Sequence, residues 1–292
     1  MSEIKPVFEF LLWANCSNNC KFCFQKQQLR DGIITKHSTE DKVKTMDNVL
    51  SFLDSDEYIK GSHVLLVGGE IFDDPTVFAE LDSFLIKIAD KMVCNDIDLL
   101  YINTNLIYKK MDCVVNFLSE IEKRGLFDRL KFTTSYDIDG RFTEKTEKLM
   151  LSNLKRLHAK FEGLHSVTNI ILSDKMCDNI LSGEFDFLKF EEEYKTEINF
   201  IPYIILIPEL SAPREKIFKT LMKINVTKPY YIEPYIIRFD LNQDKRLYNC
   251  YPDRMQYVSA PHNKCGHSVN FTRYSTKGSC YICDVMKLFL WK

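Results

Sequence analysis

The sequence predicts an α/β fold: a partial (βα)6 TIM-like barrel followed by a small C-terminal cysteine-rich domain. Three observations lead to this prediction. Six short apolar runs recur along the chain, segments with helical periodicity separate them, and the periodicity stops near Tyr230. Apolar strands that alternate with helices are typical of a parallel sheet or a βα barrel.

The predicted strands are nearly continuous apolar runs, as expected for strands that are buried in a parallel sheet. After the first run they recur every ~35 residues, close to the ~31 residues that one unit of an eight-unit barrel averages. Because only six units fit before Tyr230, the predicted barrel is partial. The strands are expected at Val7–Leu12, Val64–Val67, Leu99–Asn103, Leu130–Thr134, Val167–Leu172 and Ile198–Ile207.

Helices are predicted between these strands from apolar residues that recur at helical spacing, so that they share one face. Such a face packs against the sheet, and the methionines in it need no functional explanation. The four stripes are Val43, Met46, Leu50 and Leu53; Val77, Leu81, Leu85, Ile88 and Met92; Met150, Leu154, Leu157 and Phe161; and Ile217, Leu221 and Ile224.

After the sixth unit, Pro, Gly, Asn and Cys replace the apolar periodicity. Such a change in composition is typical of a domain boundary. We therefore predict two domains, the barrel over residues 1–237 and a cysteine-rich domain over residues 238–292.

The composition excludes several classes of protein. With 292 residues, 45% hydrophobic and 27% charged, the chain has an ordinary globular make-up. Ten cysteines are too few for a disulfide scaffold of this size. No signal peptide is evident, and the apolar stretch Ile198 to Pro208 is shorter than the ~20 residues that span a bilayer. We therefore expect a cytoplasmic protein without membrane contact, in which clustered cysteines indicate metal or redox chemistry.

Charge is unevenly distributed along the chain. From Arg238 to the end there are nine Lys and Arg against four Asp, a net +5, which leaves −7 on the rest. The same segment holds nine aromatic residues. A basic, aromatic segment can bind nucleic acid. We prefer the interpretation that this charge neutralises a nearby anionic cofactor or forms a solvated face.

Three cysteines directly follow the first predicted strand. Cys16, Cys20 and Cys23 lie in the polar stretch NCSNNCKFCF, which argues against buried structural cysteines. Three thiolates this close suit zinc, copper(I) or an iron–sulfur cluster. Structural zinc needs a fourth ligand, and the nearest histidine, His37, lies fourteen residues on. A cubane cluster with three cysteine ligands instead leaves one iron open to a chelating ligand.

The spacing Cys-x3-Cys-x2-Cys after a first β-strand, with Phe22 before the last cysteine, resembles the radical S-adenosylmethionine (radical SAM) superfamily. The resemblance implies that these cysteines hold a [4Fe–4S] cluster whose open iron binds S-adenosylmethionine (AdoMet). It also implies that an electron from the cluster cleaves AdoMet to methionine and a 5′-deoxyadenosyl radical, which abstracts hydrogen from a substrate.

Polar residues follow three further strands, at the edge where parallel βα folds bind ligands. In GGE after the second strand, glycine lets the backbone approach a ligand and the carboxylate can pair with an ammonium group. The asparagine after the third strand matches the TNG turn of many members, although Leu106 replaces the glycine. The resemblance implies cofactor-binding roles for Phe22, Gly68, Gly69, Glu70, Asn105, Ser135 and Asp137.

Four cysteines near the C-terminus, with gaps of 14, 14 and 2, suit a zinc ribbon or a four-thiolate cluster, and His267 is a rival ligand. They resemble the auxiliary-cluster domain called SPASM, or its shortened form called twitch, although Ala260 replaces a family glycine. Four cysteines suffice for one cluster, so the shortened form matches better, and we favour an auxiliary [4Fe–4S] cluster over zinc. The four are Cys250, Cys265, Cys280 and Cys283.

The remaining cysteines, Cys94, Cys113 and Cys177, stand singly in or beside predicted helices. A lone cysteine most often serves as a small hydrophobic residue. We therefore assign them no role in metal binding.

The sequence thus predicts a radical SAM enzyme that acts on a peptide or small molecule by oxidation, rearrangement or bond formation, and that receives electrons from a donor such as flavodoxin or ferredoxin. Two alternatives stay open. The same chemistry could act on a nucleotide or nucleic-acid base, or the protein could be a zinc-stabilised binding module with both cysteine groups structural. The first candidates for base contacts are Tyr248, Tyr251, Arg254, Tyr257, Arg273 and Tyr274.

Overall fold

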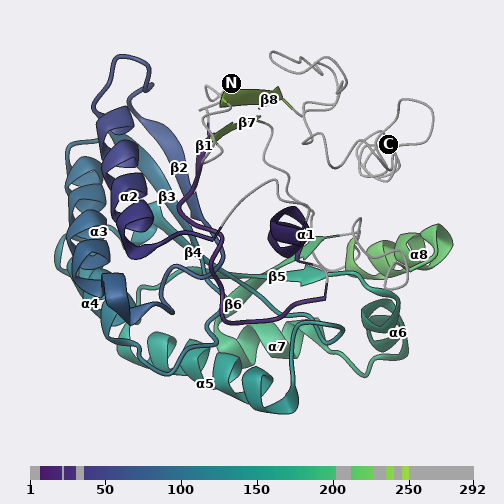
Figure 1. Ribbon diagram of the computed structural model, residues 1–292. Helices are drawn as coiled ribbons and strands as arrows, with labels where there is room; N and C mark the ends of the chain where they lie inside the picture. The colour runs from purple at the N-terminus through teal and green to yellow at the C-terminus, as the bar shows by residue number, and fades with distance from the viewer. Residues whose placement is uncertain are drawn as a thin grey trace, which may run out of the picture.

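The computed structural model describes residues 7–21, 23–30, 36–201, 212–225, 235–239 and 245–249. Its strands form one curved sheet in the order β6-β5-β4-β3-β2-β1-β7-β8 (Figure 1). All neighbouring pairs are parallel except β7 and β8. The strands are β1 (Val7–Leu11), β2 (Ser62–Val67), β3 (Ile97–Asn103), β4 (Leu130–Ser135), β5 (Ser166–Ile171), β6 (Thr196–Ile201), β7 (Tyr235–Phe239) and β8 (Lys245–Asn249).

The first six strands confirm the predicted fold class, because they alternate with helices and form an open, parallel, partial TIM-like barrel. The sequence did not predict β7 and β8. The predicted domain boundary after residue 237 falls inside β7, which pairs with β1, and β8 extends the same sheet. Most of residues 238–292 lie outside the described part of the chain, so a separate domain there stays a prediction.

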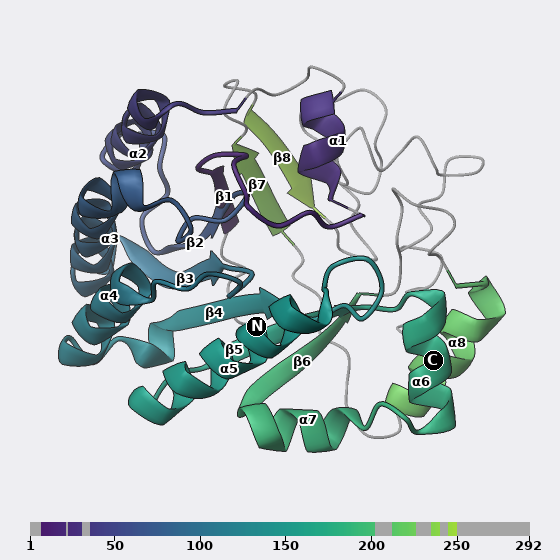
Figure 2. The same cartoon turned by 60° about the horizontal axis from the view of Figure 1, so that its bottom comes forward.

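The helices lie mainly along one face of this sheet; Figures 1 and 2 show α2 to α5 and α7 on that side, with α1 set apart. The α-helices are α1 (Phe24–Arg30), α2 (Thr39–Leu53), α3 (Phe78–Val93), α4 (Asp112–Lys123), α5 (Glu144–Lys160), α6 (Asp174–Ser182), α7 (Phe187–Tyr194) and α8 (Arg214–Asn225). Two short 3-10 helices are η1 (Pro75–Val77) and η2 (Phe127–Arg129).

Local sequence explains where the helices begin and which face they bury. Ser38 caps α2 in a capping box with Asp41, which satisfies two otherwise unpaired backbone donors. The predicted stripes are buried or packed against the core, with Leu85 and Leu154 fully inaccessible. Burial of each such side chain stabilises the fold by about 1.5–3 kcal/mol. The predicted stripes are therefore confirmed.

The two faces of the sheet differ in what they contact, because successive side chains of a strand point to opposite sides. Phe8 of β1 packs against Phe52 of α2, and Phe200 of β6 against Phe187 of α7, each with ring centroids 5.6 Å apart. These residues belong to the core under the helices. Side chains of the opposite parity line the other side of the sheet, which we call the inner face.

The parallel order of β1 to β6 brings their carboxyl ends, and the loops that follow, to one edge of the sheet. The loop from residue 12 to residue 23, between β1 and α1, lies at this edge. We call it the cysteine loop; residue 22 is outside its described part. No helix among the described residues is long and apolar enough to cross a membrane.

Candidate functional site

The cysteine loop is held flat against the end of β2. The β1–β2 ladder continues past both strands, because Gly69 N donates to Trp13 O at 2.7 Å and Glu70 N donates to Asn15 O at 2.9 Å. A Cβ on Gly69 would lie 1.9 Å from Asn15 O, and one on Gly68 would lie 2.8 Å from Trp13 O. The glycines therefore allow a close approach as expected, but the approaching group is the backbone of the cysteine loop.

Glu70 is buried inside this edge of the sheet, with no exposed surface. Its carboxylate accepts hydrogen bonds from Thr104 Oγ1 at 2.8 Å, Asn105 N at 2.5 Å and Phe72 N at 3.1 Å. Burial nevertheless raises the pKa of Glu70 to about 8, because desolvation of the charge outweighs these donors. The carboxylate thus ties the end of β2 to the turn after β3. Its predicted pairing with AdoMet stays a prediction.

Two side-chain amides contact the cysteines. Asn18 Nδ2 lies 3.3 Å from Cys20 Sγ, and Asn105 Nδ2 lies 3.5 Å from Cys16 Sγ. The predicted site residue Asn105, at the end of β3, is therefore brought to the cysteine loop. The adjacent Leu106 keeps the left-handed backbone that the missing glycine would adopt, with φ of 56°.

The loop after β4 closes the other side of the cysteine loop. Gly140 O accepts from Lys21 N at 2.8 Å. Asp137, which is 3% exposed, accepts from Arg141 Nε at 2.6 Å and from Ile171 N at 2.9 Å. Asp137 thus lies at the predicted edge, but its carboxylate is hydrogen-bonded to groups of the protein itself. Ser135 is half-buried on the inner face of β4.

Arg141 is a functional candidate that sequence reasoning missed. Burial lowers its pKa, but Asp137 and the nearby Cys20 and Cys23 thiols raise it overall, so the guanidinium stays charged. The only sequence signal was its position, four residues after Asp137 in the loop that follows a strand.

The thiols themselves are free and half-buried. Burial, assisted by the carboxylates of Glu70 and Asp73, raises the pKa of Cys16 to about 12. Burial also raises the pKa of Cys20, against the opposing charge of Arg141. The Cys16 and Cys20 thiols are therefore protonated at neutral pH when nothing is bound, and they must release protons to a metal.

The number of possible ligands distinguishes between metals. Within the described ranges, no group of three or more His, Cys, Asp or Glu side chains is gathered to hold a metal ion, so the three thiols of the cysteine loop are not brought to one point. Structural zinc takes four ligands, whereas a cubane cluster with three cysteine ligands leaves one iron open. Three free thiols in a single polar loop suit a cluster of this kind.

A row of polar side chains on the inner face contains the predicted Ser135 together with four residues that sequence reasoning missed. These residues are neighbours in the strand register, and Asn199 Nδ2 donates to Asn169 Oδ1 at 3.0 Å. Their alternation with buried residues along each strand was the available signal. We call them the inner-face row: Asn103, Thr133, Ser135, Asn169 and Asn199.

Several predicted site residues lie outside the described residues and keep their predicted roles. They are Phe22, Cys250, Cys265, Cys280 and Cys283. Of the three single cysteines, Cys113 and Cys177 are buried as expected. Cys94 is exposed at the C-terminal end of α3, so its prediction as a packed hydrophobic residue was wrong.

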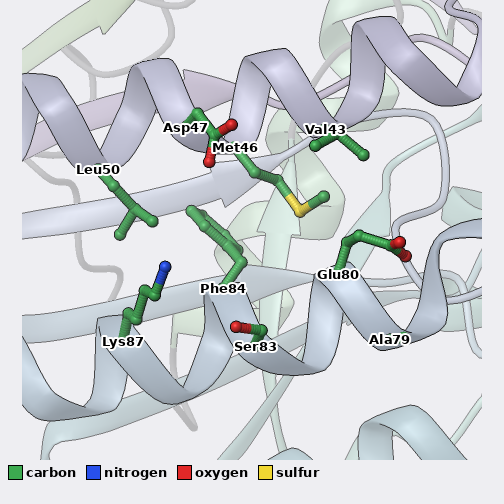
Figure 3. A pocket seen from close by; sticks show the side chains of 9 residues that line it. All are labelled: Val43, Met46, Asp47, Leu50, Ala79, Glu80, Ser83, Phe84 and Lys87. Atoms are coloured by element: carbon green, nitrogen blue, oxygen red, sulfur yellow. The ribbon is translucent and has the colours of Figure 1, made fainter.

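A groove of about 280 Å³ between α2 and α3 is distinct from this site (Figure 3). Met46 and Phe84 form part of its lining, and both belong to the core beneath the helices. Because its lining comes from helix surfaces rather than from strand ends, the groove does not belong to the cysteine site.

Comparisons with known proteins show the fold. No family model matches the sequence, and no curated protein matches it. The structure is similar to anSMEcpe, an anaerobic sulfatase-maturating enzyme of the radical SAM superfamily, with bound AdoMet: TM-score 0.52 and 12% identity, over 85% of this chain and 74% of that one. A structure of anSMEcpe with AdoMet and the Cp18Cys peptide gives TM-score 0.51 and 12% identity, over 94% and 81%.

The fold is shared. At this identity the likeness establishes architecture, and it agrees with the resemblance that the cysteine spacing and the strand-end residues indicate.

Proposed function

We propose that this protein is a radical SAM enzyme in which Cys16, Cys20 and Cys23 hold a [4Fe–4S] cluster that binds AdoMet. The observation that carries the proposal is the position of the cysteine loop. Three free, half-buried thiols lie in one loop at the carboxyl edge of a (βα)6 sheet. Three thiolates are one fewer than the four ligands of structural zinc, which favours a cluster with one open iron.

When bound, the cluster supplies the electron that cleaves AdoMet to methionine and the 5′-deoxyadenosyl radical that takes hydrogen from the substrate. The chain's own residues hold and orient the ligand. The Arg141 guanidinium, beside Cys20 and Cys23, is suited to attract the carboxylate of an amino acid. Ser135 and the rest of the inner-face row offer uncharged donors and acceptors to hydroxyl groups.

The auxiliary domain expected over residues 238–292 shares its first residues with β7 and β8 of the barrel sheet. We propose that Cys250, Cys265, Cys280 and Cys283 hold a second [4Fe–4S] cluster, with zinc as the alternative. The support is the cysteine spacing and the +5 charge of the segment, which suits an anionic cluster. Iron and zinc analysis of the purified protein distinguishes the two.

The proposed substrate is a peptide or a small molecule, and the electron donor a flavodoxin or ferredoxin. A structurally similar enzyme holds a peptide together with AdoMet, which supports the peptide. A nucleic-acid base is the second candidate because of the basic, aromatic C-terminal segment. Binding that weakens steeply with added salt favours the base.

The test is anaerobic reconstitution with iron and sulfide, followed by an assay of 5′-deoxyadenosine with AdoMet and a reductant. The expected protein is brown, with cluster absorbance near ~400 nm. Alanine at Cys16, Cys20 or Cys23 is expected to abolish AdoMet cleavage. Cys94→Ala is the matched control, because Cys94 is a free cysteine outside the loop.

A colourless preparation with stoichiometric zinc, or full AdoMet cleavage by Cys20→Ala, contradicts the proposal. Cys280→Ala addresses the second cluster: it is expected to spare AdoMet cleavage and to reduce substrate turnover. Equal loss of both activities contradicts the division into two sites.

A further inference from the structure

Asn18 and Asn105 each engage their side-chain oxygen in a local hydrogen bond. The Oδ1 atom of Asn18 accepts from the adjacent Asn19 N at 2.9 Å, and that of Asn105 accepts from Ile107 N, two residues on, at 2.6 Å. The bond of Asn105 closes an Asx turn, and both bonds fix the amide relative to the backbone. With the oxygen engaged, the Nδ2 donor of each side chain faces away from that backbone N–H.

In both cases the donor faces a cysteine sulfur. Asn18 Nδ2 lies 3.3 Å from Cys20 Sγ, and Asn105 Nδ2 lies 3.5 Å from Cys16 Sγ. The two amides come from different strand ends, since Asn18 is in the loop after β1 and Asn105 follows β3. Two separate side chains thus present an amide donor to two different thiols, and Asn18 Nδ2 also lies 3.5 Å from Arg141 O.

The position of Asn105 is set by the buried carboxylate of Glu70, which accepts from Asn105 N at 2.5 Å. Asn105 itself is only 7% exposed. Burial strengthens a hydrogen bond and makes an unpaired donor costly, so this amide has little freedom to leave its sulfur. Among the described contacts, no side-chain amide donates to Cys23, so the three thiols are not equivalent.

We propose that Asn18 and Asn105 are positioning residues that raise the reduction potential of the cluster held by Cys16, Cys20 and Cys23. This inference rests on the proposed function. A donor N–H stabilises negative charge on a thiolate, and the reduced cluster carries one electron more than the oxidised one. Hydrogen bonds to the sulfurs therefore favour reduction.

The test uses the full-length protein with its cluster reconstituted, and compares Asn18→Asp and Asn105→Asp with the parent. Aspartate keeps the Oδ1 acceptor of each local hydrogen bond and replaces the N–H donor by an oxygen. The readout is the midpoint potential from a redox titration followed by EPR spectroscopy. At a fixed solution potential, loss of the hydrogen bond to sulfur is expected to lower the ratio of reduced to oxidised cluster about fivefold.

Asn19→Asp is the matched control for the added negative charge. It lies beside Cys20, its side chain is exposed, and its Oδ1 accepts from Lys26 rather than facing a thiol. Its shift is expected to be clearly smaller than those of the other two variants. The double variant is expected to show the sum of the two single shifts, since the amides contact different sulfurs.

The inference is overturned if both aspartate variants have the same midpoint potential as Asn19→Asp. The amides would then only stabilise the loop. If the aspartate variants do not assemble a cluster, Asn18→Ser and Asn105→Ser replace them, since serine offers a side-chain oxygen as acceptor without a charge. Failure of these to assemble a cluster also overturns the inference. If the parent protein assembles no cluster, the proposed function itself fails.

Discussion

The carboxyl edge and the inner face of the sheet use polar residues in opposite ways. At the ends of β2 and β4, the carboxylates of Glu70 and Asp137 are almost fully buried and are bound by donors of the protein. On the inner face, residues such as Asn169 and Asn199 are half-buried. One hydrogen bond joins their side chains, from Asn199 Nδ2 to Asn169 Oδ1.

The difference teaches which polar residues shape the site and which are available to a ligand. The Glu70 carboxylate has no exposed surface and accepts three hydrogen bonds from the protein, so it locks two loops together. Amides with further unsatisfied donors and acceptors, open to solvent, are suited to binding. The predictions below test this division, from the largest expected effect to the smallest.

Gly69→Ala is expected to have the largest effect. The new Cβ would lie 1.9 Å from Asn15 O, so the cysteine loop must move away from β2. We expect a loss of about 3 kcal/mol or more in unfolding free energy and failure to assemble a cluster. Urea unfolding and iron content measure both effects.

Gly163→Ala is the control for this glycine, because its Cβ would lie 3.0 Å from Phe127 Cδ2, a side-chain atom that can shift. A small loss of stability is expected there. If Gly69→Ala is no worse than Gly163→Ala, the cysteine loop is not packed on β2 as described.

Leu106 tests the buried turn that presents Asn105. Its φ of 56° is strained for leucine, but the side chain is fully buried. Leu106→Ala is expected to cost about 2–5 kcal/mol of unfolding free energy. Leu106→Gly is expected to be about 1 kcal/mol more stable than Leu106→Ala, because glycine relieves the left-handed strain. The reverse order in urea unfolding contradicts this account.

Glu70 is expected to make stability depend on pH. Burial raises the pKa of Glu70 in the folded state to about 8, above its ordinary value of 4.5, so the folded state binds a proton that the unfolded state has lost. This contribution is fully present below pH ~4.5 and is lost as the pH rises to about 8. Glu70→Gln is expected to remove this dependence of the unfolding free energy on pH. Urea unfolding of both proteins between pH ~4.5 and pH ~8 measures it. An equal pH dependence in the parent protein and the variant refutes the prediction.

Asn199→Ala is expected to have the smallest effect on the fold. The residue is half-buried on the inner face and donates a single hydrogen bond, to Asn169. We expect less than ~1 kcal/mol of lost stability and normal cluster assembly. A loss comparable to that of Gly69→Ala would place the inner-face row with the structural residues and remove the contrast.

Which residues lie at the carboxyl edge was largely predictable from the sequence, because their positions depend on short-range patterns. The alternation of strands and helices placed the cysteines, GGE, Asn105, Ser135 and Asp137 at strand ends. The partners of these residues were not predictable. Glu70 was interpreted as a ligand for an ammonium group, and the structure places Thr104 and Phe72 around it, because buried carboxylates take the nearest donors of the folded chain.

The sequence by itself determined the periodicity of the barrel, the three-cysteine spacing and the glycines after β2, because each depends on residues close along the chain. Only the tertiary structure decided what Gly69 approaches, that Arg141 lies beside Cys20, and that two amides face two thiols. These contacts join residues up to 121 positions apart, from Cys20 to Arg141, and only the parallel stacking of strand ends brings them together.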